Sequence, residues 1–192
     1  MAIFEATIQH NDKTLEDLAH MQYDLFCKGN RIGRAIISIV CILLGIANSE
    51  NWWGILVIAY GCYLTTSTYS ASNHTAHKLA RQIRAAGMQF PASRYEFTEE
   101  GMVVYTLPEN KAFGEPMPYG AFCKLGEDRG NFYIFRDQYG GYMIPKSELA
   151  GEEEYFRDFI QRKSGQRFER KMAPVAKFLQ RMKDRESRPY HL

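Results

Sequence analysis

Residues 35–77 carry one charged side chain, Glu50, and this gap in the charge pattern constrains the fold more than any other feature. At the chain-wide charged fraction of 24%, a stretch of this length should hold about ten charged residues. The gap contains two apolar runs, residues 35–47 and 52–64, separated by the polar turn Asn48–Asn51. Two apolar runs joined by a tight polar turn predict a helical hairpin.

The predicted hairpin has the composition of a segment that crosses a lipid bilayer. We place it at residues 31–72, with its helices at about 32–48 and 52–69. A spanning helix needs about 20 residues, so the first apolar run is short unless the guanidinium groups of Arg31 and Arg34 extend toward the headgroups. The second run gains length from hydroxyl residues, which a helix tolerates because they bond back to its own carbonyls.

Basic residues flank the hairpin on both sides, whereas its turn has none. They are Lys28, Arg31 and Arg34 before the hairpin, and Lys78, Arg81 and Arg84 after it. Because Lys and Arg stay on the cytoplasmic side, we predict a multi-pass protein of the cell membrane with both termini in the cytoplasm. Trp52 and Trp53 fall at the outer boundary, where indoles favour the headgroup level. The predicted membrane-interface residues are Arg31, Arg34, Trp52, Trp53, Lys78 and Arg81.

A soluble protein that buries the hairpin in its core is the alternative interpretation. Apolar runs of about 10–14 residues often form core helices, and the hydropathy of the whole chain is that of a soluble protein. A core helix usually keeps a polar face, however, and residues 35–47 offer only Ser38 and Cys41. A cleaved signal peptide is rejected because a long segment precedes the first run and a second run follows it.

The segments beside the hairpin have ordinary strand and helix patterns. Residues 1–30 predict a strand at Ile3–Ile8 and a helix that begins near Thr14, whose hydroxyl is spaced from Asp17 as in a capping box. Residues 73–92 predict a helical juxtamembrane linker.

Residues 93–167 change to short aromatic runs broken by turn signals. This pattern predicts antiparallel strands that curl into a small sandwich or barrel with a core of its own. The expected strands are residues 94–98, 102–107, 122–125, 131–135 and 142–144. A helix follows them, with the acids Glu152–Glu154 near its N-terminus and Ser164-Gly165 at its end.

Three segments of this β-rich part carry more specific motifs. They are Tyr95-Glu-Phe-Thr-Glu-Glu-Gly-Met102, Met117-Pro-Tyr-Gly-Ala-Phe-Cys-Lys124 and Tyr142-Met-Ile-Pro-Lys146. They resemble the aromatic–acid–Gly entry, the Y-x-x-I-x-K segment and the hydrophobic-Pro-Lys end of the C-terminal domain in the YcxB-like family of bacterial membrane proteins. The order of parts along the chain is also similar to that family, although Phe122 stands where the family usually carries an aliphatic residue.

The resemblance implies a pleckstrin-homology-like (PH-like) sandwich closed by a C-terminal helix. It implies no reaction, because the family has no established activity. We therefore expect an α+β protein with an N-terminal strand and helix, a transmembrane helical hairpin, and a small antiparallel PH-like β-sandwich capped by a C-terminal helix.

The sequence contains no motif for catalysis or for a cofactor. Phosphate-binding glycine loops, nucleophile elbows and zinc-protease motifs are missing, so we expect no enzyme and no cofactor. The cysteines Cys27, Cys41, Cys62 and Cys123 form no C-x-x-C pair and are expected to be small packing residues. His74 and His77 could share a helix face, but without further ligands they predict a solvated pair and no metal site.

The C-terminal tail, residues 168–192, is basic. From residue 161 onward the chain carries a net charge of +7. Apolar residues at helical spacing within 172–182 predict an amphipathic helix at about 173–185, which would contact anionic lipid. A solvated tail is an equal alternative, because isolated short helices are marginal in water. Nucleic-acid binding is not expected, since the charge lacks an aromatic platform.

Two functions remain open at this point. The first is a non-enzymatic integral membrane protein whose cytoplasmic sandwich is an interaction or sensing module. The second is a membrane-bound accessory subunit of a transporter or toxin-immunity system, in which the hairpin contacts the partner through small residues such as Gly45, Gly54 and Gly61. The protein partner is not identified by either function.

Overall fold

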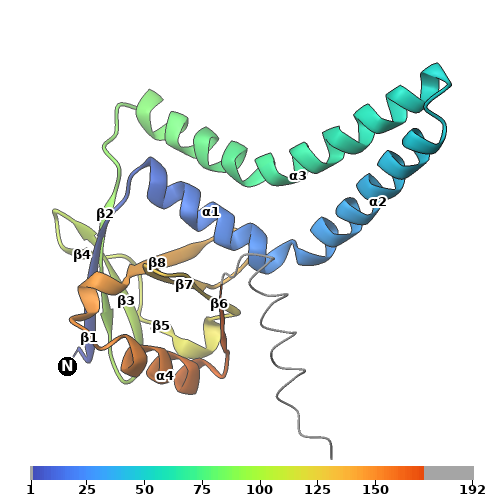
Figure 1. The fold of residues 1–192 in the computed structure, drawn as a ribbon. Coiled ribbons are helices and arrows are strands. Elements are labelled where there is room, and N and C mark those ends of the chain that lie inside the picture. The colour runs from blue at the N-terminus through green and yellow to red at the C-terminus, as the bar shows by residue number, and fades with distance from the viewer. Residues whose placement is uncertain (1, 171–192) are drawn as a thin grey trace, which may run out of the picture.

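The computed structural model describes residues 2–170 and has an α+β architecture (Figure 1). Inside this range, the side chains of Arg31, Tyr69, Thr75 and residues 71–73 are outside the description. The N-terminal elements are β1 (Phe4–Gln9), α1 (Asp12–Phe26), α2 (Lys28–Ala47) and α3 (Trp52–Ala85). The following elements are β2 (Ala92–Phe97), β3 (Gly101–Leu107), β4 (Lys111–Ala112), β5 (Met117–Pro118), β6 (Lys124–Glu127), β7 (Asn131–Phe135), β8 (Gly141–Pro145), α4 (Glu153–Ser164) and β9 (Phe168–Arg170). The α+β class predicted from the sequence is confirmed.

The strands form two sheets. In the first sheet the order is β1-β2-β3-β4, with β5 also paired to β3, and all pairs are antiparallel. In the second sheet the order is β8-β7-β6-β9, where β6 and β9 are parallel. Short 3-10 turns, Tyr119–Ala121 and Lys146–Leu149, lead into β6 and out of β8.

The N-terminal strand belongs to the first sheet. β1 pairs with β2 in a register that places Phe4 opposite Phe97 and Gln9 opposite Ala92. Side chains along β1 alternate between buried and exposed, as expected of a strand with one face on a core. β1 and β2 are thus neighbours in space although α1, α2 and α3 separate them in the chain.

Helix α1 begins earlier than the sequence indicated. Its N-cap is Asn11, whose side chain accepts a hydrogen bond from the Thr14 backbone N–H at 3.0 Å, while the Thr14 hydroxyl accepts one from the Asn11 N–H at 2.8 Å. The prediction of Thr14 as the N-cap is therefore wrong. Asn also caps helices well, and here it leaves Thr14 in the third helical position of the capping box.

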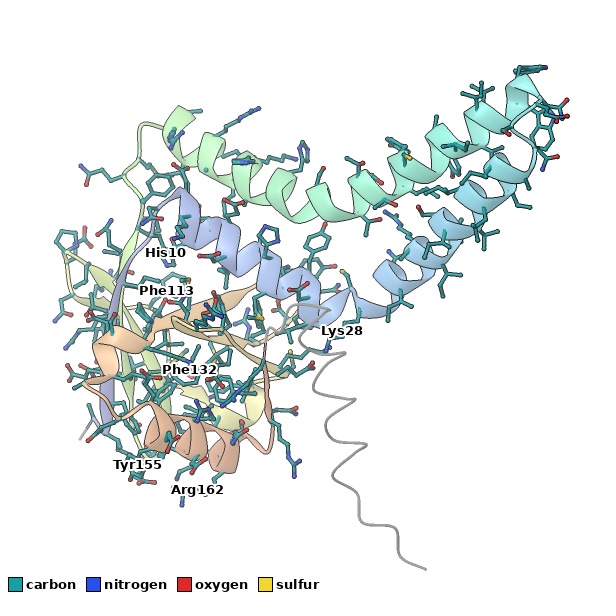
Figure 2. All side chains as sticks on the ribbon, viewed as in Figure 1. His10, Lys28, Phe113, Phe132, Tyr155 and Arg162 are labelled. Atoms are coloured by element: carbon teal, nitrogen blue, oxygen red, sulfur yellow. The ribbon has the colours of Figure 1, made fainter. Side chains whose placement is uncertain are left out.

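One aromatic core joins the N-terminal segment to the β-rich part, with α4 closing it. The ring of Phe156 in α4 lies 5.2 Å from Phe4, 4.9 Å from Phe97 and 5.2 Å from Phe132, measured between centroids. Figure 2 shows Phe132 between the sheets and α4. The contacts with Phe4 and Phe97 are edge-to-face, a geometry that adds to the stabilisation from burial.

Helix α1 covers the second sheet and completes the same core. Met21 and Leu25 are buried there, and β6 has a glycine beneath them: a Cβ on Gly126 would lie 2.7 Å from the Met21 sulfur. The sequence placed residues 1–30 outside the β-rich part and gave residues 93–167 a separate core. The structure differs, because β1 and α1 supply buried side chains to that core.

Helix α3 continues past the expected end of the hairpin and forms most of the predicted linker. Its second half, residues 74–85, packs against α1, with Ala76 and Ala80 buried. α2 and the first part of α3 extend away from the sheets (Figure 1). We call this extension, residues 28–70, the helical arm. The tail helix predicted at 173–185 lies outside the described residues, whereas Phe168–Arg170 joins the second sheet as β9.

Candidate functional site

The helical arm has an apolar surface that no other described part of the protein covers. Its exposed apolar or aromatic residues are Ile32, Ile36, Ile37, Ile39, Val40, Leu43, Leu44 and Ile46 on α2, with Trp52, Trp53, Ile55, Leu56, Tyr60 and Tyr63 on α3. Soluble monomers rarely expose a continuous apolar surface of this extent. The arm is therefore the part of the described chain that most needs a binding partner or a non-aqueous environment.

The length of the arm matches a lipid bilayer. α2 has 20 residues, which at 1.5 Å per residue give about 30 Å, the thickness of the hydrocarbon core. Among the described helices, α2 is the one long and apolar enough to cross a membrane by composition. The second predicted span, residues 52–69, lies in α3, where tryptophan, tyrosine and hydroxyl residues lower the hydropathy. It remains a prediction.

Small residues bring the two helices of the arm into close contact. A Cβ on Gly45 would lie 2.7 Å from the Gly54 carbonyl oxygen, and one on Gly61 would lie 3.0 Å from the Ser38 carbonyl oxygen. Ser38 and Gly45 are seven residues apart on α2, as are Gly54 and Gly61 on α3. Because the helices are this close, a side chain at any of the three glycines would force them apart. Close packing through small residues is how helices associate where lipid removes the hydrophobic driving force.

A hydroxyl pair links the helices inside the arm. Ser38 is 2% exposed; its Oγ donates to the Gly61 carbonyl at 2.7 Å and lies 2.6 Å from the Thr65 hydroxyl oxygen. Both side chains are thus satisfied without water. A buried hydroxyl needs such partners, because leaving it unpaired in an apolar medium costs several kcal/mol.

Three neighbouring hydroxyl residues of α3, Thr66, Ser67 and Thr68, are satisfied within the helix. Thr66 and Thr68 donate to the carbonyls four residues earlier, at 3.0 and 2.7 Å, and Ser67 donates to the Leu64 carbonyl at 3.1 Å. These bonds make the run tolerable in lipid. Bonds of this kind also bend helices, and α3 changes direction beyond them (Figure 1).

The predicted interface residues lie at the tip of the arm, near its base and on the second half of α3. Trp52 and Trp53 lie at the tip, 76% and 41% exposed, beside the polar turn. Arg34 is exposed in α2 near the base, while the side chain of Arg31 is outside the described part. Lys78 and Arg81 are exposed on the second half of α3, beyond the arm. The structure therefore gathers tryptophan at one end and separates it from the basic residues.

The base of the arm is tied to the second sheet. Lys28, the first residue of α2, pairs with Glu169 of β9. Figure 2 shows Lys28 where α1 ends and α2 begins. β9 was not predicted, and through this ion pair it places the end of the described chain beside the base of the arm.

A charged cluster in the β-rich part consists of the buried Glu127 and Lys146 with the partly buried Arg157. The Lys146 ammonium donates to Glu127 Oε1 at 2.7 Å, and Arg157 donates to both carboxylate oxygens, at 2.7 and 3.0 Å. Burial on its own raises the pKa of Glu127, but the hydrogen bonds from Arg157 and Lys146 outweigh it and hold that pKa below its ordinary value of 4.5. The cluster joins β6, the turn after β8 and α4.

Sequence reasoning missed this cluster because its members are far apart and belong to no motif. The pairing of β6 with β7 and of β7 with β8, together with the packing of α4 on the sheet, brings them together. Both carboxylate oxygens of Glu127 accept hydrogen bonds from cationic side chains of the protein itself. The geometry therefore indicates a structural role, in which one carboxylate holds α4 and the strand ends together.

The described residues contain no cluster of three or more His, Cys, Asp or Glu side chains that could hold a metal ion. His74 and His77 are both exposed on the second half of α3. The four cysteines are free: Cys27 and Cys41 are half-buried, and Cys62 and Cys123 are exposed.

Comparison with known proteins places the chain in no group. No family model, curated protein or solved structure matches it. The functional argument therefore rests on the helical arm and its surroundings.

Proposed function

We propose that this chain is an integral membrane protein without catalytic activity, whose arm spans the cell membrane and whose β-rich part is a cytoplasmic interaction or sensing module. The observation that carries the proposal is the exposed apolar surface of the helical arm. Bilayer lipid covers such a surface on all sides at once, which a single protein partner does not.

Three features of the arm support a bilayer environment. Its length is that of the hydrocarbon core, its buried Ser38 hydroxyl is paired without water, and tryptophans lie at the tip. Basic residues lie only toward the base, so the tip faces outward and both chain ends face the cytoplasm. On this proposal the arm is a two-span, multi-pass anchor.

The proposed anchor predicts that the full chain remains in the membrane after an alkaline carbonate wash. The physical reason is that the wash removes peripheral proteins but leaves apolar surface in lipid. Replacing Ile39 and Leu43 together by lysine should release most of the protein, because each charge at mid-membrane costs about 3 kcal/mol. The matched control places the same two lysines at Thr7 and Gln9, which are exposed on β1. Wild-type protein in the supernatant would contradict the proposal.

We also propose membership of the YcxB-like family with a PH-like sandwich. The three resembling segments support it by their positions: the first forms the β2–β3 hairpin, the second leads from β5 into β6, and the third ends β8. The two sheets closed by α4 are compatible with a sandwich of that kind. The resemblance adds no reaction to the proposal.

One observation favours the second candidate function, a membrane-bound accessory subunit of a transporter or toxin-immunity system. The large exposed apolar residues of α2 are all aliphatic, whereas α3 exposes the phenols of Tyr60 and Tyr63 about halfway along the arm. Phenol hydroxyls at that depth would be better satisfied by a partner helix than by lipid tails.

If a partner helix binds there, replacing Tyr60 and Tyr63 by phenylalanine should lower its recovery in mild detergent severalfold. The loss follows from removing two hydrogen-bonding groups in an apolar medium. Replacing Ile36 and Leu43 by valine on α2 serves as the control, and equal recovery from both variants would count against a contact through α3.

A further inference from the structure

The second half of α3 has two chemically distinct faces. Ala76 and Ala80, both 4% exposed, are buried where the helix packs against α1. At 3.6 residues per turn, the opposite face carries His74, Lys78 and Arg81, with His77 at its edge, and all four are exposed. The face turned away from α1 is therefore basic.

This basic face lies on the side of the molecule toward which the arm extends. In Figure 1 the second half of α3 forms the outer layer, α1 lies beneath it, and the sheets follow below α1. The outer side of the second half of α3 is thus turned in the direction in which the arm extends. If the arm enters a bilayer, the basic face is turned toward the surface of that bilayer.

Charge on this segment is of one sign. Residues 51–95 contain no Asp or Glu, so the helix itself offers the basic face no acidic partner. Arg84 forms an ion pair with Asp12 at the start of α1, whereas Lys78 and Arg81 form no ion pair with any described residue. These two cations remain available for an external anion.

We propose that the second half of α3 lies along the inner surface of the membrane and that Lys78 and Arg81 bind the headgroups of anionic lipids. The inference rests on the proposed membrane function and adds the ligand and the orientation. Because α1 packs on this half-helix with one face and on the second sheet with another, headgroup binding holds the β-rich part in a fixed orientation beneath the membrane.

The expected strength follows from the charge of the leaflet. A basic residue near an anionic surface gains about 1 kcal/mol, so losing both should lower the preference for anionic over neutral lipid about 30-fold. The attraction is screened by salt, because the Debye length falls from about 10 Å at 0.1 M to about 3 Å at 1 M.

The test is lipid cross-linking from a position on the basic face. A benzophenone amino acid replaces Ala85, which is exposed one turn beyond Arg81, in the full chain. The protein is placed in nanodiscs of phosphatidylcholine alone, or of phosphatidylcholine mixed with phosphatidylglycerol, and the fraction cross-linked to lipid is measured. We expect severalfold more lipid adduct with phosphatidylglycerol at low salt, and a loss of that difference at high salt.

Paired variants assign the effect to the two residues. Lys78→Gln with Arg81→Gln should abolish most of the preference for phosphatidylglycerol. Arg129→Gln with Arg136→Gln removes the same charge from exposed turns of the β-rich part and should leave it unchanged. The tail is intact in both variants, so its charge cannot account for a difference between them.

Each contrary outcome has a distinct meaning. Release of the wild-type protein from membranes by the carbonate wash would overturn both the proposed function and this inference. A wild-type protein that stays in the membrane but cross-links equally in both lipids would overturn only the inference. Retained preference in the Lys78→Gln, Arg81→Gln variant would also overturn it.

Discussion

A fragment of residues 89–170 expressed alone is expected not to fold, although it contains nearly all of the strands. Joining residues 2–27 to it should restore cooperative unfolding. The linker replaces the arm and the rest of α3, and it must reach from the C-terminal end of α1 back to its N-terminal end. Residue 91 lies at that N-terminal end, because the Pro91 carbonyl accepts a hydrogen bond from the His10 N–H. A Gly/Ser linker of about 20 residues has an end-to-end distance of about 25 Å, which suffices.

The reason is the number of core side chains that the N-terminal segment supplies. Phe4, Ile8, Met21 and Leu25 are all at least 95% buried in the shared core. Burying each contributes about 1.5–3 kcal/mol, so together they contribute about 10 kcal/mol, comparable with the whole stability of a typical domain. The fragment also leaves the β2 edge unpaired, which favours aggregation.

Urea unfolding followed by near-ultraviolet circular dichroism measures this directly. In the linked chain, Phe4→Ala should lower the free energy of unfolding by about 3–5 kcal/mol, because its ring contacts Phe156 and Phe159. Thr7→Ala, at an exposed position of the same strand, should change it by less than about 0.5 kcal/mol. Cooperative unfolding of the 89–170 fragment would show that the β-rich part has a core of its own.

Replacing Glu127 by glutamine is expected to lower the free energy of unfolding by about 3 kcal/mol. The change leaves the Lys146 ammonium and the Arg157 guanidinium beside a neutral group in a buried site, with the Lys146 side chain only 9% exposed. Glu99→Gln is the matched control, because its carboxylate pairs with Lys163 at the surface and should matter by less than about 1 kcal/mol. Chemical unfolding of the linked chain, or of the full chain in mild detergent, gives both values.

The same variant should change how stability depends on pH. The pKa of Glu127 in the folded protein lies below its ordinary value of 4.5, so its stabilising effect is complete above that value. The effect is lost as the pH falls through the lower, folded-state pKa. The difference between wild type and Glu127→Gln should therefore shrink on acidification, and a difference that grows would contradict the assigned ion pairing.

Local patterns in the sequence predicted the elements of this fold better than their partners. The charge gap and the turn Asn48–Asn51 located α2 and the start of α3, and β7 lies where its aromatic run indicated. These signals are periodicities within a few residues. The pairing of β1 with β2 depends on contacts between distant segments, and neither strand's pattern identifies its partner.

The remaining differences have similar causes. β6 begins at Lys124, two residues later than expected, because Phe122 is the C-cap of the 3-10 turn Tyr119–Ala121 that precedes the strand. β9 is three residues long and was predicted as part of a basic tail, since its composition is polar and only its pairing with β6 makes it a strand. The cluster at Glu127 needs three elements to be in place before it exists.

Labelling of single cysteines in intact cells tests the central proposal most directly, in a chain whose native cysteines are replaced by serine. Ser49 lies exposed in the turn at the tip of the arm, and Lys111 lies exposed in β4. If the arm spans the membrane twice with both ends inside, a membrane-impermeant maleimide labels Ser49→Cys in intact cells and labels Lys111→Cys only after lysis. Labelling of Lys111→Cys in intact cells, or of Ser49→Cys only after lysis, would contradict an arm that spans the membrane with both chain ends in the cytoplasm.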